Sequence, residues 1–202
     1  LVNKGDVVVQ AGCWRTETVE EWAEAVGSKG DVIVIEADDV NADILDVEIK
    51  RRGLDNVTLV RKAVWHEPTT VELQVSDVSD RNKLKNSQTY SPRQSPENYE
   101  AEKEVPGDSI DNIVKEAGVE TVDHVHMTIS GAEIEAIEGM TETLRNPGVR
   151  LFVRAILCHE EEDVPINREV ARMLEDRGLN VTLAKQEPNR GNGGNVYAWR
   201  PE

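Results

Sequence analysis

Apolar positions at the start of the chain predict a strand, a helix and a second strand. The run from Val7 to Val9 ends in the small-residue turn Ala11-Gly12. The next segment places apolar residues at helical spacing along one face, namely Val19, Trp22, Ala23 and Val26. Val32 to Ile35 is apolar at every position, as a strand buried on both faces must be. The pattern predicts the first β–α–β unit of a sheet with parallel strands.

Cap residues predict where the first helices begin and end. Thr18 to Glu21 reads Thr-x-x-Glu, the pattern of a capping box, and is expected to start the first helix. Gly27 suits the left-handed turn that ends such a helix. Asn41 is the expected N-cap of a second helix, which runs to Gly53.

The same alternation continues to the C-terminus. Further strands are expected at Asn56 to Val60, Val122 to Ile129 and Val149 to Leu157, with a closing antiparallel pair at Val181 to Leu183 and Val196 to Trp199. Further helices are expected after a cap at Asp108 or Ser109, from Gly131 to Leu144, and from a cap at Asn167 to Gly178. Alternating strands and helices with two final strands predict an α/β fold with a mostly parallel sheet and an antiparallel edge.

One region departs from this alternation. Val71, Leu73 and Val75 alternate with polar residues, which predicts a strand with one wet face outside the central sheet. Residues 76–104 have almost no apolar periodicity and contain two Ser-Pro steps. They are expected to form a long loop, either a lid over a substrate or an insertion. The whole chain, residues 1–202, is expected to form a single domain.

The charge balance excludes some classes of partner. The chain has 39 acidic and 23 basic residues, a formal net charge of −16, and only nine of its basic residues are lysine. Such a surface repels nucleic acid and anionic membranes, so neither is an expected partner. Carboxylates spread along the whole chain favour the cytoplasm of a salt-adapted organism. An acidic docking face for a protein partner is the alternative.

Targeting and cysteine patterns agree with a cytoplasmic location. No run approaches the roughly 18 apolar residues of a membrane helix, and no signal peptide is visible. Cys13 and Cys158 are too few for a disulfide framework, which favours a reducing interior. Because Leu1 is not a methionine, an upstream segment is expected to be missing or processed.

Residues at the predicted strand ends indicate a ligand site. Ligands of such sheets bind beyond the carboxyl ends of the strands, so Gly12 and Glu36 are expected to face one crevice. A carboxylate that closes the second strand can accept hydrogen bonds from both hydroxyls of an adenosine ribose. A solvated loop carboxylate is the alternative interpretation of Glu36.

Five segments in order resemble the FkbM family of S-adenosylmethionine-dependent methyltransferases. They are GDVVV at 5–9, VIVIEADDVNADIL at 32–45, GLDNVTLVRKAVW at 53–65, VPGDSIDNIV at 105–114 and VHMTISGAEIEAIEGM at 125–140. The resemblance covers nearly the whole chain. It implies a Rossmann-like methyltransferase fold with seven strands and helices on both faces, S-adenosylmethionine as cofactor, and O-methylation of a small-molecule or glycan hydroxyl.

The resemblance also implies site residues. Cofactor-binding residues are expected at Gln10, Gly12, Glu36, Thr128, Ser130 and Gly131, and a catalytic base or acceptor-orienting carboxylate at Glu133. Gln10, Thr128 and Ser130 stand where the family has carboxylates, and Trp14 and Arg15 replace small residues. A neutral hydrogen bond is worth about 0.5–1.5 kcal/mol against roughly 1.5–3 for a charged one, so cofactor binding is expected to be weaker. An inactive binding or scaffold protein is therefore the first alternative, and a Rossmann domain with another adenosine cofactor the second.

Three other groups of residues have competing interpretations. Glu133 can also be a helix-N-terminal carboxylate that interacts with the macrodipole. His124, His126 and the pair Cys158-His159 can meet at one edge of the sheet, but their spacing is not a recognised zinc pattern, so no metal is expected. Trp14, Trp65 and Trp199 can line the crevice as an aromatic pocket, although packing at the sheet edge is favoured for Trp199.

Overall fold

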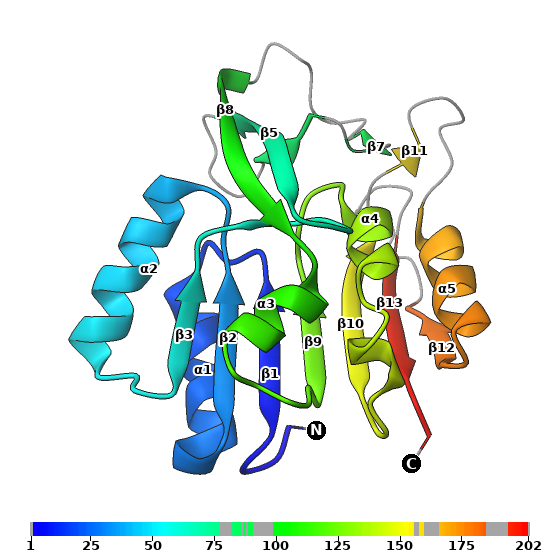
Figure 1. Cartoon of the computed structure of the whole chain (residues 1–202), viewed down its shortest axis with the longest axis horizontal. Coiled ribbons are helices and arrows are strands. Elements are labelled where there is room, and N and C mark those ends of the chain that lie inside the picture. Colours follow the sequence, from blue (N-terminus) through cyan, green and yellow to red (C-terminus); the bar gives the residue numbers. More distant parts are fainter. Residues whose placement is uncertain are drawn as a thin grey trace.

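A seven-stranded central sheet organises the computed structural model, which describes residues 2–76, 82–85, 87, 89–90, 99–155, 158–159, 166–184 and 194–201. The strand order is β12-β13-β10-β9-β1-β2-β3 (Figure 1). The strands are β1 Val7–Ala11, β2 Asp31–Ile35, β3 Val57–Val60, β9 His124–Met127, β10 Arg150–Ala155, β12 Asn180–Leu183 and β13 Gly194–Trp199. Strand β13 runs antiparallel to both β10 and β12, whereas the other pairs are parallel. The predicted parallel sheet with an antiparallel edge is confirmed.

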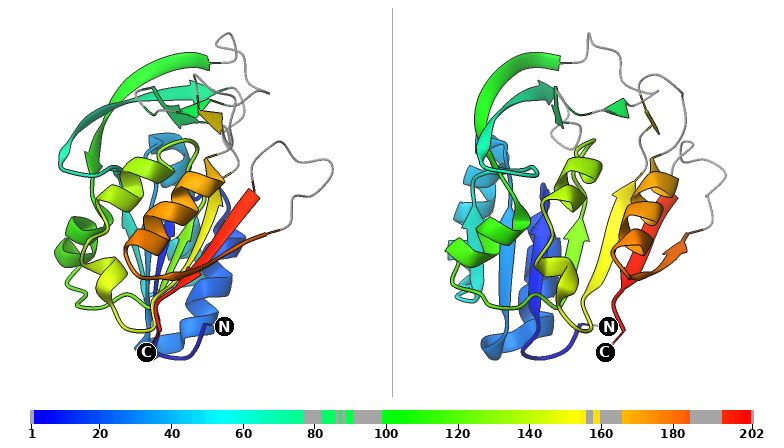
Figure 2. Two further views of the ribbon diagram at one scale, coloured as in Figure 1. Left: turned by 90° about the vertical axis from the view of Figure 1, so that its right-hand side faces the viewer. Right: turned by 45° about the vertical axis from the view of Figure 1, so that its right-hand side comes forward.

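Helices cover both faces of this sheet (Figure 2). They are α1 Thr16–Val26, α2 Asp39–Arg52, α3 Ile110–Glu116, α4 Glu133–Glu138 and α5 Asn167–Asp176, with short 3-10 turns at Gly27–Lys29 and Thr143–Arg145. Alternation along the strands separates two apolar clusters. Val8, Val32 and Val34 pack with α1 and α2, while residues such as Val9 and Ile33 pack with α3, α4 and α5. The period-2 geometry of a strand thus divides the core between the two faces.

Three predicted N-caps are wrong. Helix α1 begins at Thr16 with Arg15 as its N-cap and no side-chain cap, so Thr18 lies inside the helix. Helix α2 begins at Asp39 because the Asp38 carboxylate, not Asn41, caps it and accepts from the Asn41 amide at 3.0 Å. In α2 the carboxylate of Asp38 reaches a free amide of the first helical turn, so it takes the cap position predicted for Asn41. The cap at Ser109 is confirmed. The predicted cap at Asn167 is wrong by one residue, because Asn167 is the first residue of α5 and Ile166 is its N-cap.

The predicted helix from Gly131 to Leu144 is also corrected. Helix α4 ends at Glu138, and Gly139 follows in close contact with another segment. A Cβ at Gly139 would lie 2.8 Å from the Trp65 carbonyl oxygen. A separate 3-10 turn then starts at Thr143, where the Asp111 carboxylate accepts from the Thr143 amide at 2.8 Å. Tight packing against the Trp65 segment therefore divides what the apolar spacing predicted as one helix.

A second, four-stranded sheet rises above the carboxyl ends of the central strands (Figure 1). Its order is β4-β8-β5-β6, with β4 Ala63–Val64, β5 Thr69–Ser76, β6 Lys83–Leu84 and β8 Tyr99–Asp108. Residues 69–76 therefore lie outside the central sheet, as predicted. Residues 99–104, expected in the loop, are strand, because backbone pairing with β5 rather than a buried face defines them. The remainder of the predicted lid includes a short strand β7, Thr89–Tyr90, paired with β11, Cys158–His159. Residues 77–81, 86, 88 and 91–98 lie outside the described part.

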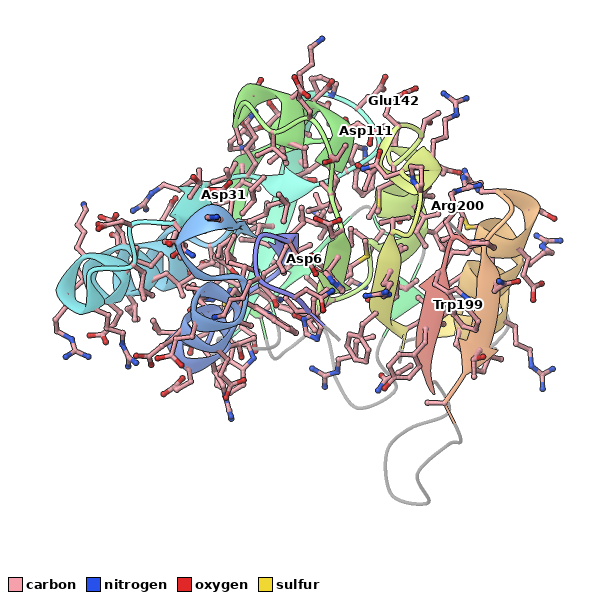
Figure 3. All side chains as sticks on the ribbon, turned by 90° about the horizontal axis from the view of Figure 1, so that it is seen from below. Asp6, Asp31, Asp111, Glu142, Trp199 and Arg200 are labelled. Atoms are coloured by element: carbon pink, nitrogen blue, oxygen red, sulfur yellow. The ribbon has the colours of Figure 1, made fainter. Side chains whose placement is uncertain are left out.

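The opposite end of the molecule carries acidic side chains. Seen from below, Asp6 and Asp31 lie at the amino ends of β1 and β2, whereas Asp111 lies in α3 and Glu142 beside it (Figure 3). Asp6 contacts the His124 Nε2 atom at 2.8 Å, so part of this charge is engaged in local hydrogen bonds. Within the described ranges no helix has both the length and the apolar character needed to cross a membrane.

Candidate functional site

A pocket lies where β1, β2 and β9 end, beneath the second sheet. The loops after these strands contribute Gly12, Glu36, Thr128 and Ser130. Other lining residues come from the segment after β3 and from β5 and β6 in the sheet above, among them Lys62, Leu73, Lys83 and Leu84. Gln10 and Gly131 are not among the lining residues. The structure thus brings together four of the six residues predicted to bind a cofactor.

Gly12 allows the β1 turn to approach the β9 turn closely. Its φ of +74° lies in the left-handed region, which favours glycine. A Cβ at this position would lie 2.9 Å from the Thr128 carbonyl oxygen and 3.0 Å from Ile129 Cγ2. The Gly12 amide donates to the Ile35 carbonyl at 2.9 Å. Only glycine lets these three turns meet at one pocket.

Glu36 is a buried, oriented carboxylate rather than a solvated one. It is 8% exposed, and it lines the pocket. Its Oε2 accepts from the Cys13 amide at 3.0 Å and its Oε1 accepts from the Asp38 amide at 2.8 Å. Burial raises the pKa of Glu36, and hydrogen bonds from backbone amides oppose that shift. Each carboxylate oxygen has a further lone pair with which it can accept a hydroxyl of a ligand.

Gln10 lies behind the pocket. The side chain is 2% exposed, and its Nε2 donates to the Gly12 carbonyl at 2.8 Å and to Thr128 Oγ1 at 3.1 Å. Thr128 Oγ1 in turn donates to the same carbonyl at 2.7 Å. Gln10 therefore contacts the turn that borders the pocket, whereas Thr128 both holds the turn and lines the pocket.

Glu133 supports a neighbouring turn from below. Its side chain is 0% exposed and does not line the pocket. The Oε2 atom accepts from the Gly131 amide at 3.1 Å, and Thr89 Oγ1 donates to the Gly131 carbonyl at 2.9 Å. Burial raises the pKa of Glu133 to about 8, so its carboxyl is protonated at neutral pH. In this arrangement Glu133 and Gly131 shape the loop beside the pocket and do not line it.

Of the three tryptophans proposed for the crevice, only Trp14 lines the pocket. Trp14 is 42% exposed, and the Arg15 guanidinium stacks over its ring at 4.0 Å. This cation–π contact holds the Trp14 ring, and Arg15 itself is not among the residues that line the pocket. Trp199 lies at the far end of β13, away from the pocket (Figure 3). Trp65 packs in the apolar cluster beneath the second sheet.

Two lysines of the pocket were not predicted from the sequence. Lys62 Nζ donates to Asp108 Oδ2 at 2.8 Å and to Glu116 Oε2 at 2.7 Å, and these hydrogen bonds raise the pKa of Lys62. Lys83 is buried, and its Nζ donates to the Thr89 carbonyl at 2.5 Å. The segment around Lys83 has no apolar periodicity. The only feature of the sequence that distinguishes these two residues is that lysine is scarce in this acidic chain, and it does not indicate a place in the pocket.

The strand histidines have partners other than a metal. His124 Nε2 contacts Asp6 Oδ2 and His126 Nδ1 contacts Gln10 Oε1, each at 2.8 Å. The His126 ring stacks on Phe152 with centroids 4.5 Å apart, and burial lowers the pKa of His126 to about 4. In the described part of the chain, no group of three or more His, Cys, Asp or Glu residues is arranged to hold a metal ion. The side chains of Cys158 and His159 lie outside that part.

Comparisons with known proteins point to one family. A family model described as the methyltransferase FkbM domain matches residues 3–181. The structure is similar to an FkbM methyltransferase from Methylobacillus flagellatus KT, with a TM-score of 0.64 and 15% identity over 98% of this chain and 44% of that chain. The chain therefore spans less than half the length of that relative.

Other solved structures share the fold. Fibrillarin from Aeropyrum pernix, in complex with natively bound S-adenosyl-L-methionine, has a TM-score of 0.58 and 14% identity over 98% of this chain and 67% of that chain. A putative O-methyltransferase from Klebsiella pneumoniae has a TM-score of 0.56 and 14% identity over 98% of this chain and 74% of that chain. No curated protein matches the chain. Identities of this size establish a common fold only. The substrate and the activity have to be inferred from the residues of the site.

Proposed function

Because the chain belongs to the FkbM family of methyltransferase domains, we propose that its pocket binds S-adenosylmethionine and that it methylates a hydroxyl of a small molecule or glycan. Glu36 carries the proposal. It is a buried carboxylate at the carboxyl end of β2, and two backbone amides orient its two oxygens toward a pocket bordered by the Gly12 turn. A carboxylate acceptor at this place in the sheet suits the hydroxyls of an adenosine ribose.

Each pocket residue has a definite task in this proposal. S-adenosylmethionine supplies an electrophilic methyl group on a sulfonium. Glu36 would accept the ribose hydroxyls, and Thr128 and Ser130 would accept hydrogen bonds from the methionyl ammonium. Leu73 and Leu84 of the upper sheet would exclude water from the ligand. Methyl transfer depends chiefly on alignment of the acceptor, which a walled pocket provides.

A base role for Glu133 stays a prediction. Its protonated state at neutral pH and its place below the Gly131 turn favour a supporting role, because a general base must come within hydrogen-bond reach of the acceptor. We propose that Glu133 holds the turn and that the acceptor hydroxyl loses its proton to another group or to solvent.

A binding protein without catalysis is the second candidate. Trp14 lines the pocket with Arg15 stacked on its ring, at positions where the family has small residues, and Thr128 and Ser130 are neutral. These substitutions reduce the anionic field around a sulfonium. They favour a ligand-binding or scaffold role if the cofactor is held in a pose that cannot react.

Calorimetric titration with S-adenosylmethionine and S-adenosylhomocysteine in molar salt tests the proposal. We expect micromolar binding, and we expect Glu36→Gln to weaken it about 10- to 100-fold because a charged acceptor worth roughly 1.5–3 kcal/mol is lost. Glu138→Gln, an exposed change on α4, is the matched control and should bind normally. No heat and no thermal stabilisation at millimolar ligand would exclude the cofactor. Binding without turnover of any hydroxyl acceptor would favour the second candidate.

A further inference from the structure

The Gln10 side chain uses every hydrogen-bonding position of its amide. Its Nε2 donates to the Gly12 carbonyl and to Thr128 Oγ1, at 2.8 and 3.1 Å. Its Oε1 accepts from Trp22 Nε1 at 3.2 Å and contacts His126 Nδ1 at 2.8 Å. An amide offers two donors and two lone pairs, so all four are engaged.

These partners fix the direction of the amide. The indole N–H of Trp22 can only donate, and the Gly12 carbonyl can only accept. The amide oxygen must therefore face α1, and the NH2 group must face the Gly12 turn. Burial keeps His126 neutral, with a pKa of about 4, and its Nδ1–H then donates to the same amide oxygen. The stacked Phe152 ring holds the imidazole in this orientation.

The network reaches the pocket through one carbonyl. The Gly12 oxygen accepts from both Gln10 Nε2 and Thr128 Oγ1, so the turn is held from behind by β1 and β9. The next amide along the turn, that of Cys13, donates to Glu36. A shift of the Gly12 turn would therefore move a donor that orients the proposed ribose-binding carboxylate.

We propose that Gln10 is a positioning residue that holds the Gly12 turn in the shape that receives the cofactor, and that this network requires a neutral amide. A carboxylate at this place would present an oxygen to the Gly12 carbonyl, where a donor is needed. Gln10 is then a constituent of this site rather than the remnant of a lost carboxylate. This inference rests on the proposed function and explains how a site with a neutral residue at the end of β1 can still be ordered.

The test replaces one atom of the amide. Gln10→Glu should weaken S-adenosylhomocysteine binding about tenfold or more at about pH 8, where two acceptors would face each other. Binding should recover only below the pH at which His126 takes up its proton, because the carboxyl beside the charged imidazole is protonated last and only the protonated carboxyl can again donate to the Gly12 oxygen. Ionisable groups close to residue 10 are His126 on β9, and Cys13 and Glu36 through the turn. All three remain in the unaltered chain, which serves as the control at each pH.

A second measurement does not depend on the cofactor. In Gln10→Glu the new carboxylate would face His126 Nδ1, and an opposite charge at hydrogen-bond distance raises the pKa of a histidine. We therefore expect NMR titration of the imidazole to show a pKa clearly above the value of about 4 in the unaltered chain. Trp22→Phe, which removes one donor to the Gln10 amide oxygen and lies outside the pocket lining, should weaken ligand binding by a smaller factor while leaving the His126 pKa low. It also serves if Gln10→Glu does not fold.

The outcomes separate the two proposals. If the unaltered chain binds and both variants bind equally well with no pH-dependent recovery, the positioning role is wrong. An unchanged His126 pKa in Gln10→Glu would show that His126 does not contact the side chain of residue 10 as described. If the unaltered chain binds neither S-adenosylmethionine nor S-adenosylhomocysteine, the proposed function fails, and the cofactor role of Gln10 fails with it. The His126 titration still reports on the network in that case.

Discussion

At the scale of single residues, the buried carboxyl of Glu133 makes stability depend on pH. Its pKa is raised from 4.5 to about 8 in the folded chain, so the folded state holds a proton that the unfolded state releases. Stability is therefore lost as the pH rises from about 4.5 toward 8, by at most about 1.4 kcal/mol per pH unit. Glu133→Gln mimics the protonated form. In urea unfolding, the free energy of unfolding of this variant should therefore rise relative to that of the unaltered chain between about pH 6 and pH 8.

The control for this prediction is a carboxylate on the same helix. Glu138 is exposed, and Glu138→Gln should leave the slope of stability against pH unchanged. If the unfolding free energies of the unaltered chain and of Glu133→Gln change in parallel with pH, Glu133 is ionised in the folded chain. Such a result would also restore Glu133 as a possible base.

Residue positions in the site were predictable only where a strand end determined them. Gly12, Glu36, Thr128 and Ser130 follow three strands of one parallel sheet, so their convergence follows from topology. The direction of the Gln10 side chain could not be predicted, because it depends on Trp22 and His126 from two other elements. Lys83 joins the pocket through a strand that pairs with β5 and has no pattern of its own.

At the scale of elements, the sequence predicted the strands better than the helix ends. Buried strands such as β2 are apolar at nearly every position, and that signal has few competitors. Helix starts depend on which of several polar side chains reaches a free amide, and Asp38 and Thr18 show that neighbouring candidates are not distinguishable by spacing alone. The break at Gly139 depends on contact with Trp65, which is distant in sequence.

Two cap substitutions test the helix starts. Ser109 Oγ accepts from the Asn112 amide at 3.2 Å, so Ser109→Ala should cost about 1 kcal/mol of unfolding free energy. Thr18→Ala should be neutral or slightly stabilising, because Thr18 lies within α1 and alanine has the higher helix propensity. Denaturant midpoints of the two variants provide the measurement. An equal loss in both would reinstate the capping box at Thr18.

At the scale of the whole molecule, the upper sheet and the central sheet share apolar packing. Val71 and Leu73 of β5 pack in one cluster with Ala132 and Ile129, which belong to the loop after β9. This continuity supports the proposal that residues 1–202 form one domain. Carboxylates occur at the pocket, where Glu36 lies, and also at the opposite end, where Figure 3 shows Asp6 and Asp31. A charge distributed over both ends favours adaptation to salt over a local docking face.

Salt adaptation predicts a specific stability profile. With 39 acidic against 23 basic residues, repulsion between carboxylates opposes the compact state at low ionic strength. The Debye length falls from about 8 Å at 0.15 M to about 3 Å at 1 M, so potassium chloride should raise the melting temperature by at least about 3 °C over this range. Glu21 and Glu24 are exposed neighbours on α1 with like charge. Replacing both by glutamine should raise the melting temperature at low salt and leave it unchanged in molar salt. An equal difference at both salt concentrations would show that repulsion does not limit the stability of this chain.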